Sequence, residues 1–417
     1  MRKRILLALG LLVASIGSSR GQDPAPLPVP AESGSVSLMA SPSSGSSFQF
    51  AAPDDNGWLA AEFLFGWIEG SHLPALVTTS PTGTAQTVAG VLGQSTTTVL
   101  LGGTINRDLL SGFRLGGGYL YNKESGLGVE AGILYLPSQS SSYLFTSDNN
   151  SILGRPYFNA KTIVATTNPT GNPAAVLVAF PGNSTGRINV NAKTGDFFTA
   201  NFNLTERIWA PDDSGFRIDG LLGYRVATFN DRLRISHHID SLNPLLPGTS
   251  IDSFDDFSAR NTFNGADFGF RTSYSWNERL SVDLLTKVAA GNMHRTVNIR
   301  GQQTTTVTGA PPPVTLPGGV YALSSNIGKY SSNVGAVLPE GGANLNWRLR
   351  SNMNLKVGYS LLYLGRVQRA DDQIDLTVNP DLFPPAVPAA TPRRPVFADN
   401  TSNIWIQTLN VGLDVTF

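Results

Sequence analysis

The chain has 417 residues and no cysteine, and its 30 basic residues balance its 30 acidic ones. Charged residues make up 14%, which is low for a soluble surface, while apolar runs are too few for a helical membrane protein. The zero net charge gives no reason to expect nucleic acid as a partner. The missing cysteines exclude disulfides, thiolate metal sites and a lipidated N-terminal cysteine.

Residues 1–21 are predicted to be a signal peptide for export. Basic residues at 2–4 precede an apolar run at 5–16, and Ser19 and Gly21 provide small residues at the spacing of a cleavage site. The alternative is a membrane anchor, but the run is well short of the roughly 20 apolar residues that a spanning helix needs. We therefore expect cleavage after Gly21.

Residues 22–56 are predicted to form a disordered leader ahead of the folded part. The segment is rich in Pro, Ser, Ala and Gly and shows no periodicity. After it, residues 57–417 alternate repeatedly between apolar and polar positions, so we expect one β domain over this range.

Ten segments of this domain have the period-two alternation of a strand with one apolar and one polar face. In the first, Leu59, Phe63 and Trp67 share one face and Glu62 lies on the other. The ten predicted strands are 59–67, 113–121, 127–135, 198–204, 216–226, 268–276, 280–288, 343–349, 353–363 and 409–417.

Two features favour lipid, rather than a second sheet, as the cover of the apolar face. The polar face carries isolated charges of both signs among Gly, Asn and Ser, whereas a secreted β-sandwich tolerates dense charge there. Trp and Tyr gather near the segment ends, where a membrane barrel places aromatic side chains at the headgroup level. The sequence therefore predicts an all-β fold, a closed antiparallel transmembrane β-barrel, with a secreted sandwich as the alternative.

The lengths of the connections predict the number of strands. Short breaks alternate with long ones, like the periplasmic turns and outer loops of outer-membrane barrels. Five long hairpins give about 10 strands and return both termini to the periplasm; twelve strands are the alternative, because 235–239 could form an extra one. The short breaks are 122–126, 210–215, 277–279 and 350–352, and the long ones are 70–110, 147–186, 240–261, 301–333 and 371–402.

The chain end gives a second indication of a barrel. Asn410, Gly412, Val415 and Phe417 form a polar-x-Gly-x-x-apolar-x-aromatic pattern that ends at the last residue and is in phase with the alternation. The pattern resembles the C-terminal signal that the bacterial barrel-insertion machinery reads. We therefore expect that machinery and outer-membrane lipid as partners, with the oligomeric state left open.

On the inward faces of the predicted strands, basic and acidic residues nearly balance. A barrel of about ten strands is small enough for side chains to fill its lumen, where paired charges satisfy one another. The alternative is a narrow polar conduit in which opposed charges select small solutes. The predicted lumen-facing charges are Glu62, Arg114, Glu130, Arg217, Asp219, Arg225, Asp267, Arg271, Asp283, Lys287, Glu340, Arg348, Lys356, Arg366 and Asp414.

The histidines give little support for catalysis or metal binding. His237, His238 and His294 are expected near the outer strand ends, and Asp255 and Asp256 in a long outer loop. His and Asp at the rim of a ten-stranded barrel could activate water for hydrolysis, but this is an analogy of fold alone. Adjacent histidines point to opposite faces of a strand, and no spacing of two His and a carboxylate is present. We therefore expect no enzyme, no metal and no cofactor.

Short motifs along the chain resemble one known family. They include WLAAEFLFGWIEG at 58–70, RPYFN at 155–159, SFDDFSARN at 253–261 and VGY at 357–359. In this order they resemble the beta-barrel porins of type seven, a family found mainly in planctomycete bacteria, over nearly all of residues 57–417. The resemblance implies an outer-membrane barrel and no catalytic or binding residues.

A barrel in the bacterial outer membrane leaves two main classes of function. The first, which the strand number favours, is a structural or surface-interaction barrel, or a narrow porin-like channel, with a lumen largely filled by side chains. The alternative is a porin for passive diffusion of small solutes. A hydrolase at the outer rim is a remote third possibility.

Overall fold

The computed structural model describes residues 56–417, except 107, 213, 245–246 and 310–311. The predicted signal peptide and all of the predicted leader apart from Asn56 lie outside the described residues. The described part is all-β, and none of its helices is long and apolar enough to cross a membrane. Its helical segments are three short 3-10 turns, η1 (Ala160–Thr162), η2 (Asp371–Gln373) and η3 (Pro380–Leu382).

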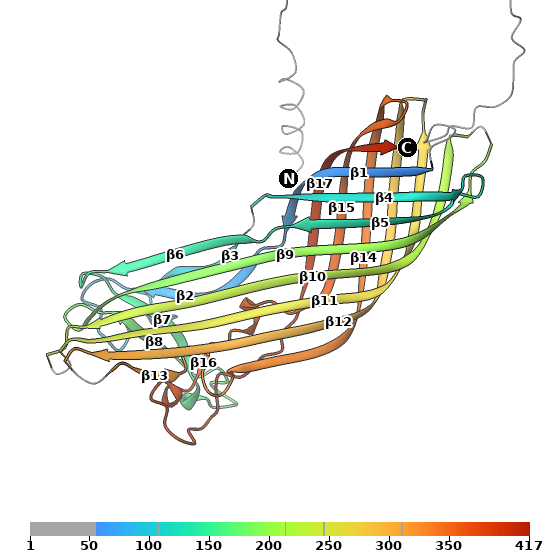
Figure 1. Cartoon of the computed structure of the whole chain (residues 1–417). Helices are drawn as coiled ribbons and strands as arrows, with labels where there is room; N and C mark the ends of the chain where they lie inside the picture. The colour runs from blue at the N-terminus through green and yellow to red at the C-terminus, as the bar shows by residue number, and fades with distance from the viewer. Residues whose placement is uncertain (1–55, 107, 213, 245–246, 310–311) are drawn as a thin grey trace, which may run out of the picture. The chain divides into compact units, whose positions relative to one another are not determined.

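Ten strands are hydrogen-bonded side by side, each antiparallel to its neighbours, in a ring that closes on itself (Figure 1). This confirms the prediction of an all-β, antiparallel fold with a ring of about ten strands. Residues 235–239 continue β10 and add no further strand. In order around the ring, the strands are β1 (Gly57–Ile68), β4 (Leu110–Asn122), β5 (Leu127–Leu136), β9 (Ser184–Trp209), β10 (Phe216–Ser241), β11 (Thr249–Ser275), β12 (Leu280–Val307), β14 (Gly328–Arg350), β15 (Met353–Val367) and β17 (Ser402–Thr416).

The seam of the ring is the pairing between its first and last strands, which starts with Trp58 opposite Thr416. At this end Gly57 and Phe417 each donate a backbone N–H to the other's carbonyl oxygen at 2.9 Å. The Phe417 ring lies against Gly57, where an added Cβ would be 2.7 Å from it. Pairing across the seam satisfies backbone groups that an open sheet would expose.

The predicted short breaks are tight turns at one end of the ring. Asn122 and Asn277 each accept hydrogen bonds from the backbone N–H groups two and three residues later, which fixes the start of the turn. Gly126 and Gly215 have φ values of 65° and 63°, in the left-handed region that glycine adopts without strain. Asn56, the first described residue, accepts a hydrogen bond from β4 at the same end.

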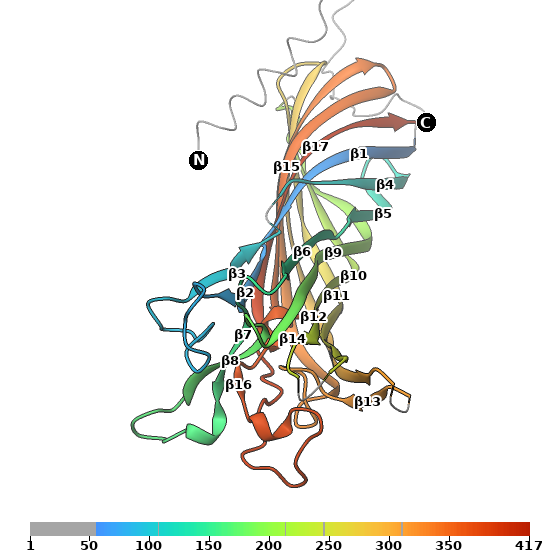
Figure 2. The ribbon, with the colours of Figure 1, turned by 90° about the vertical axis from the view of Figure 1, so that its left-hand side faces the viewer.

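The connections at the other end, which the sequence predicted to be loops, contain strands of their own (Figure 2). Five of these strands form a second sheet, and two more pair with strands of the ring. The second sheet consists of β2 (Ser71–Thr79), β3 (Thr98–Ile105), β7 (Leu153–Asn159), β8 (Asn172–Ala179) and β16 (Thr377–Val378), while β6 (Gln139–Ser147) pairs with β9 and β13 (Val314–Pro317) pairs with β12.

The long strands β9, β10, β11, β12 and β14, of 23 to 28 residues, run beyond the others toward the second sheet (Figure 1). β12 has 28 residues and β11 has 27, whereas β1 has 12. The predicted long loops at 240–261 and 301–333 are therefore wrong in large part, because β10 and β11 are joined only by residues 242–248 and β12 continues to Val307. The segments were misread because their alternation continues with the two faces exchanged.

This exchange of faces is clear along β12. Near the turns, Leu284 points outward and is 49% exposed, while Lys287 points inward and is buried. Beyond Asn292 the pattern reverses, so that His294 is exposed on the outside and Val297 is fully buried on the inside. A strand that is apolar outside and polar inside thus becomes polar outside and apolar inside.

The exchange occurs at the same level on neighbouring strands. The registers place Val226 of β10 opposite Asn264 of β11, Asn264 opposite Asn292 of β12, and Asn292 opposite Gly335 of β14. We call this row the boundary row, and the parts of β9–β12 and β14 beyond it the outer extension. On the turn side of the row, the exposed outward residues form the apolar belt, which includes Leu59, Phe63, Phe113, Phe202, Leu204, Leu222, Tyr224, Phe268, Phe270, Leu284, Val337, Leu345, Trp347, Tyr359 and Leu413.

The inner face of the outer extension packs on the second sheet to form the outer core (Figure 2). The ring contributes fully buried side chains such as Ile235, Phe257 and Val297, and the second sheet contributes Leu76 and Val178. The segment 320–323 and η3 also contribute buried side chains to this core. Burial of this apolar surface explains why the outer connections are ordered.

Candidate functional site

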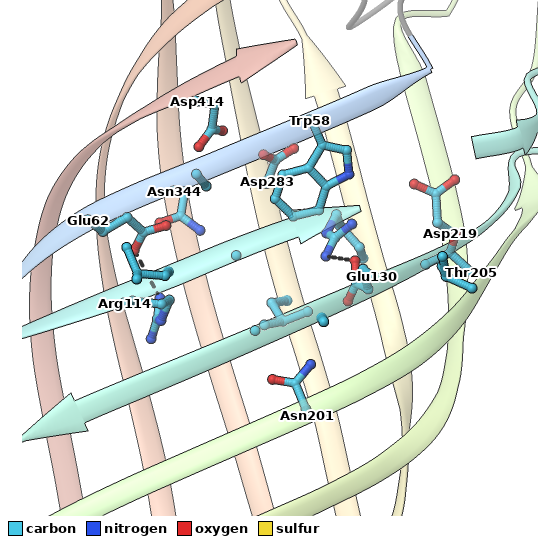
Figure 3. A pocket seen from close by; sticks show the side chains of 18 of the residues that line it. Trp58, Glu62, Arg114, Glu130, Asn201, Thr205, Asp219, Asp283, Asn344 and Asp414 are labelled. Carbon is cyan, nitrogen blue, oxygen red and sulfur yellow. Dashed lines mark hydrogen bonds and ion pairs between the residues drawn. The ribbon is translucent and has the colours of Figure 1, made fainter. Parts of the chain in front are cut away.

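A cavity of about 290 Å³ lies inside the ring at the turn end, and charged side chains line it (Figure 3). Asn56, Gly57 and Thr416 belong to its lining, so it extends to the end of the ring where the seam begins. Alternation aims every second side chain of each strand into this space. Of the charges predicted to face the lumen, those that line the cavity are Glu62, Arg114, Glu130, Arg217, Asp219, Arg225, Arg271, Asp283, Lys287, Glu340, Lys356 and Asp414.

One group of ion pairs lies beside the seam. Glu62 Oε2 is 3.2 Å from Arg114 Nη1, and its Oε1 is 3.4 Å from Lys356 Nζ. Lys356 Nζ also lies 2.9 Å from Asp414 Oδ2. Arg114 uses a second nitrogen, Nη2, to donate to Ser360 Oγ at 2.8 Å. The carboxylates and cations of four strands are thereby joined into one network.

A second group centres on Asp267, which is fully buried. Its Oδ2 lies 2.7 Å from Lys287 Nζ and 3.2 Å from Arg225 Nη2. Arg225 Nη2 also contacts Glu340 Oε2 at 2.5 Å. The four side chains come from β10, β11, β12 and β14, so this group connects strands on the side of the ring that carries the outer extension.

A third group lies nearest the turns. Glu130 Oε2 is 2.7 Å from Arg271 Nη2, and its Oε1 accepts a hydrogen bond of 3.1 Å from Asn203 Nδ2. Arg217 Nε lies 2.9 Å from Asp219 Oδ2 on the same strand. The pair between Glu130 and Arg271 spans the ring, because β5 and β11 are not neighbours.

The remaining predicted charges are not all in the lumen. Asp283 is there, and accepts hydrogen bonds of 2.7 Å from Ser273 Oγ and Asn346 Nδ2. Arg348 is half-buried on the inward face of β14 close to its turn. Arg366 is instead exposed, with a φ of 60° at a register shift of β15, and donates to the Gly335 carbonyl. The shift turns its side chain away from the face that alternation predicted.

Without Arg366, the predicted charges on the inward face are seven acidic and seven basic residues, most of them in ion pairs with one another. Arg207, which the predictions did not include, also lines the cavity and donates to the Glu124 carbonyl at 3.0 Å. Such ion pairs offset the cost of removing each charge from water, and removing one partner of a buried pair costs roughly 3–5 kcal/mol. A lining in which charges of both signs are paired is suited to filling the ring rather than to attracting an ion of one sign.

An apolar layer lies inside the ring next to this cavity, on the side of the outer extension. Every one of the ten strands contributes at least one buried, inward-pointing apolar side chain to it. These side chains form one buried hydrophobic cluster inside the ring. The layer consists of Leu64, Ile68, Leu110, Leu134, Leu136, Phe197, Ala227, Phe229, Phe263, Ala289, Met293, Ala336, Leu338, Leu362, Leu364, Val367, Ile404 and Ile406.

The sequence predictions did not include this layer, although the sequence contains a signal for it. The alternation of apolar and polar residues stops at the level of this layer. Leu64 lies between two outward phenylalanines, and Leu134 and Leu136 lie on either side of the outward Tyr135. Ile404 and Ile406 flank Trp405 in the same way on β17. A run of consecutive apolar residues within an alternating strand marks a level at which both faces are apolar.

Trp58 is a further lining residue that the predictions did not include. Its ring points into the cavity (Figure 3) and lies over the backbone of β4, where a Cβ at Gly118 would be 2.6 Å from Trp58 Nε1. Large rings on one strand thus require glycine on the next. The last strand also contributes to the cavity region, because the fully buried Asn410 donates to Asn344 Oδ1 at 3.0 Å.

The predicted insertion-signal residues all lie on or directly after the last strand of the ring. Asn410 points inward, Gly412 lies opposite Glu62 where a Cβ would clash with the Ala61 carbonyl, and Phe417 is 62% exposed at the seam. Recognition of these residues by the insertion machinery remains a prediction.

The rim residues considered for hydrolysis do not come together. His237 is buried, with its Nδ1 3.1 Å from Arg155 Nη1. Burial is the main reason that its pKa is well below the usual value, and the positive charge of Arg155 lowers it further. Asp255 is fully buried beside it in the outer core. His238 lies on the opposite face, with its Nδ1 2.7 Å from Asp252 Oδ1. Among the described residues, no group of three or more His, Asp or Glu is arranged to hold a metal ion.

Several solved structures are similar to this chain at low identity. The outer membrane protease OmpT of Escherichia coli is 9% identical with a TM-score of 0.38, over 89% of this chain and 100% of that chain. The attachment invasion locus protein Ail of Yersinia pestis is 8% identical with a TM-score of 0.20, over 87% of this chain and 99% of that chain. A Pseudomonas aeruginosa FadL homologue is 9% identical with a TM-score of 0.20, over 87% and 91%. No conclusion about function follows from likeness at this level.

The search of curated proteins found no match. One family, described as "Putative beta barrel porin-7 (BBP7)", matches residues 58–417, which is nearly the whole of the described part. This confirms the resemblance that the short motifs indicated. The chain belongs to the beta barrel porin-7 family.

Proposed function

We propose that the chain is an exported outer-membrane barrel that conducts no solutes and carries an ordered domain at the cell surface. The observation that carries the proposal is the apolar layer, to which all ten strands of the ring contribute between the charged cavity and the outer core. Packed at the density of a protein interior, this layer would leave no path for a hydrated solute. Membership of a beta barrel porin family and the apolar belt support the outer membrane as its location.

The dimensions of the apolar belt fit a bilayer. On β14 the outward apolar residues run from Val337 to Trp347, which at about 3.3 Å per residue and a tilt of roughly 40° gives a height of ~25 Å. Trp209, Trp276 and Trp347 are exposed beside the turns, where aromatic side chains of membrane barrels meet the headgroups. We place the turns and the chain termini in the periplasm, and the outer extension with its core outside the cell.

The surface role rests on the outer core. Loops of a simple pore need no hydrophobic core of their own, whereas here the second sheet and the outer extension bury a contiguous apolar cluster. The ring below supplies a rigid base, and its paired charges hold the strands together without an open lumen. We assign no enzymatic activity, because His237 and Asp255 are too deeply buried to reach a substrate.

Planar-bilayer recording of the refolded chain tests the proposal. Heat-modifiable mobility on a gel first establishes that the ring has formed and inserted. We expect no discrete current steps from protein inserted in this way. Reproducible steps at the same protein density would refute the closed ring and favour passive diffusion of small solutes. Failure to insert under conditions in which other refolded barrels insert would refute the membrane location.

A further inference from the structure

Five basic residues gather on the outward face of the outer extension, in what we call the basic cluster. Lys193 of β9 lies directly opposite Arg232 of β10, and both side chains are exposed. Arg234 lies one outward position further along β10, with 40% of its side chain exposed. Arg300 of β12 is 55% exposed, and Arg260 of β11 is exposed between them and the boundary row.

The protein supplies little negative charge to this cluster. Asp256 lies at its centre and is contacted by Arg232 at 2.7 Å, by Arg300 at 2.6 Å and by Arg234 at 3.8 Å. Although burial opposes it, hydrogen bonds from Arg232 hold the pKa of Asp256 below its usual value, so this carboxylate is ionised. At the lower edge, Asp196 accepts a hydrogen bond of 3.2 Å from the Tyr135 hydroxyl.

Five cations therefore share Asp256 at their centre and Asp196 at their lower edge. Asp252, the next acid on the outward face of β11, is instead 2.7 Å from His238. Like charges lie directly opposite each other at Lys193 and Arg232. Like charges directly opposite each other on neighbouring strands destabilise a sheet. A bound anion would reduce the repulsion between Lys193 and Arg232. No hydrogen bond or ion pair occupies the Lys193 or Arg260 side chain within the described part of the chain. Guanidinium groups in this arrangement suit phosphate, which they bind through paired N–H donors.

The height of the basic cluster above the apolar belt indicates where the phosphate would lie. Arg260 and Arg300 are four and eight residues beyond Asn264 and Asn292 of the boundary row. At about 3.3 Å per residue and a tilt of roughly 40°, this places them ~10–20 Å above the belt. That zone contains phosphates and sugars of a glycolipid, and extends beyond the headgroup of a simple phospholipid.

We propose that the basic cluster and the belt below it bind a phosphorylated glycolipid of the outer leaflet. The phosphates contact Lys193, Arg234 and Arg260, while acyl chains lie on the exposed apolar side chains of neighbouring strands, such as Leu222 and Phe268. The inference rests on the proposed function, because it requires the outer extension to face the outer leaflet.

Binding of lipopolysaccharide to the refolded full chain in neutral detergent micelles tests this inference. The test variant is Lys193→Gln/Arg234→Gln/Arg260→Gln, which keeps the two close partners of Asp256. The matched control is Lys123→Gln/Arg279→Gln/Arg350→Gln, which removes three positive charges near the turns. Each membrane-proximal cation adds a several-fold gain in affinity for an anionic surface, so we expect the test variant to bind roughly 10- to 100-fold more weakly and the control to bind like the original chain.

Three further arms identify the ligand chemistry. Dephosphorylated lipopolysaccharide, phosphatidylglycerol micelles and inorganic phosphate should all bind more weakly than intact lipopolysaccharide. The proposal is overturned if the test variant binds like the original chain, or if any of these three binds as tightly. Insertion is measured separately by heat-modifiable mobility. A chain that inserts and gives no current steps but does not bind lipopolysaccharide would refute only this inference. A chain that fails to insert would refute the proposed function.

Discussion

Arg155 and Asp255, which are 100 residues apart in the chain, form an ion pair of 2.6 Å between Nη2 and Oδ2 in which both side chains are fully buried. The second carboxylate oxygen of Asp255 accepts three backbone N–H bonds, of 2.9, 2.9 and 2.7 Å, from residues 320–322. The hydroxyl of Tyr321 donates in turn to the Pro156 carbonyl at 2.9 Å. One carboxylate thus connects β7, β11 and the segment after β13 within the outer core.

Asp255→Ala should destabilise the outer core. The substitution leaves Arg155 buried without its partner and removes the acceptor of three N–H groups, which should cost about 3–5 kcal/mol of unfolding free energy. Limited proteolysis should then cut near residues 320–322. The control is Asp252→Ala, whose side chain is 60% exposed beside His238 and which should change stability by less than about 1 kcal/mol. Equal sensitivity of the two variants would contradict the role of Asp255.

Asp371 should make the stability of the outer region depend on pH. It accepts the backbone N–H of His72 at 2.7 Å, and burial, opposed by Arg369 at 3.7 Å, raises its pKa to about 7. Because the folded pKa lies above the ordinary value of 3.8, the unfolded chain loses this proton first, and stability falls as pH rises from about 4 to 7. The loss from this group amounts to up to about 4 kcal/mol.

Asp371→Asn keeps an oxygen acceptor for His72 and removes the titration. Its free energy of unfolding in micelles should therefore fall less between pH 4 and pH 8 than that of the original chain. Asp381→Asn, which alters an exposed pair with Lys161, serves as the control and should follow the original pH profile. Parallel profiles for all three proteins would show that Asp371 does not carry the effect.

The apolar layer should respond to truncation more strongly than the apolar belt. Phe263 is fully buried in the layer, whereas Phe270 on the same strand is 54% exposed on the outward face. Phe263→Ala leaves a cavity and should cost about 3–5 kcal/mol in urea unfolding from micelles. Phe270→Ala should cost clearly less, because lipid or detergent fills the space that the ring vacates. If the costs were equal, inward packing at this level would not stabilise the ring.

The sequence predicted the ring because lipid imposes one rule on every strand. Most of each segment must be apolar outside and polar inside, as Phe113 beside Arg114 and Leu284 beside Asp283 illustrate. The short turns were equally predictable, since Asn122 and Gly126 are typical turn residues whose requirements are local.

The outer region was not predictable by the same rule. Beyond the boundary row the outward face meets water and the inward face meets the second sheet, so the residues from Ser253 to Asn261 look like a polar loop although they form a strand. The contacts that order them, such as Arg155 with Asp255, join distant segments that no local pattern relates. Arg366 was misplaced for a similar reason, because a register shift in β15 changes the face on which it lies.

The central claim is that lipid covers the outward face below the boundary row and water covers it above. The chain has no cysteine, so single-cysteine variants along β12 can each carry one nitroxide label. In vesicles, labels at Leu284 and Val288 should collide with oxygen and be shielded from a water-soluble nickel chelate, whereas labels at His294 and Asn298 should show the opposite. Uniform access of the nickel chelate to all four positions would contradict the claim.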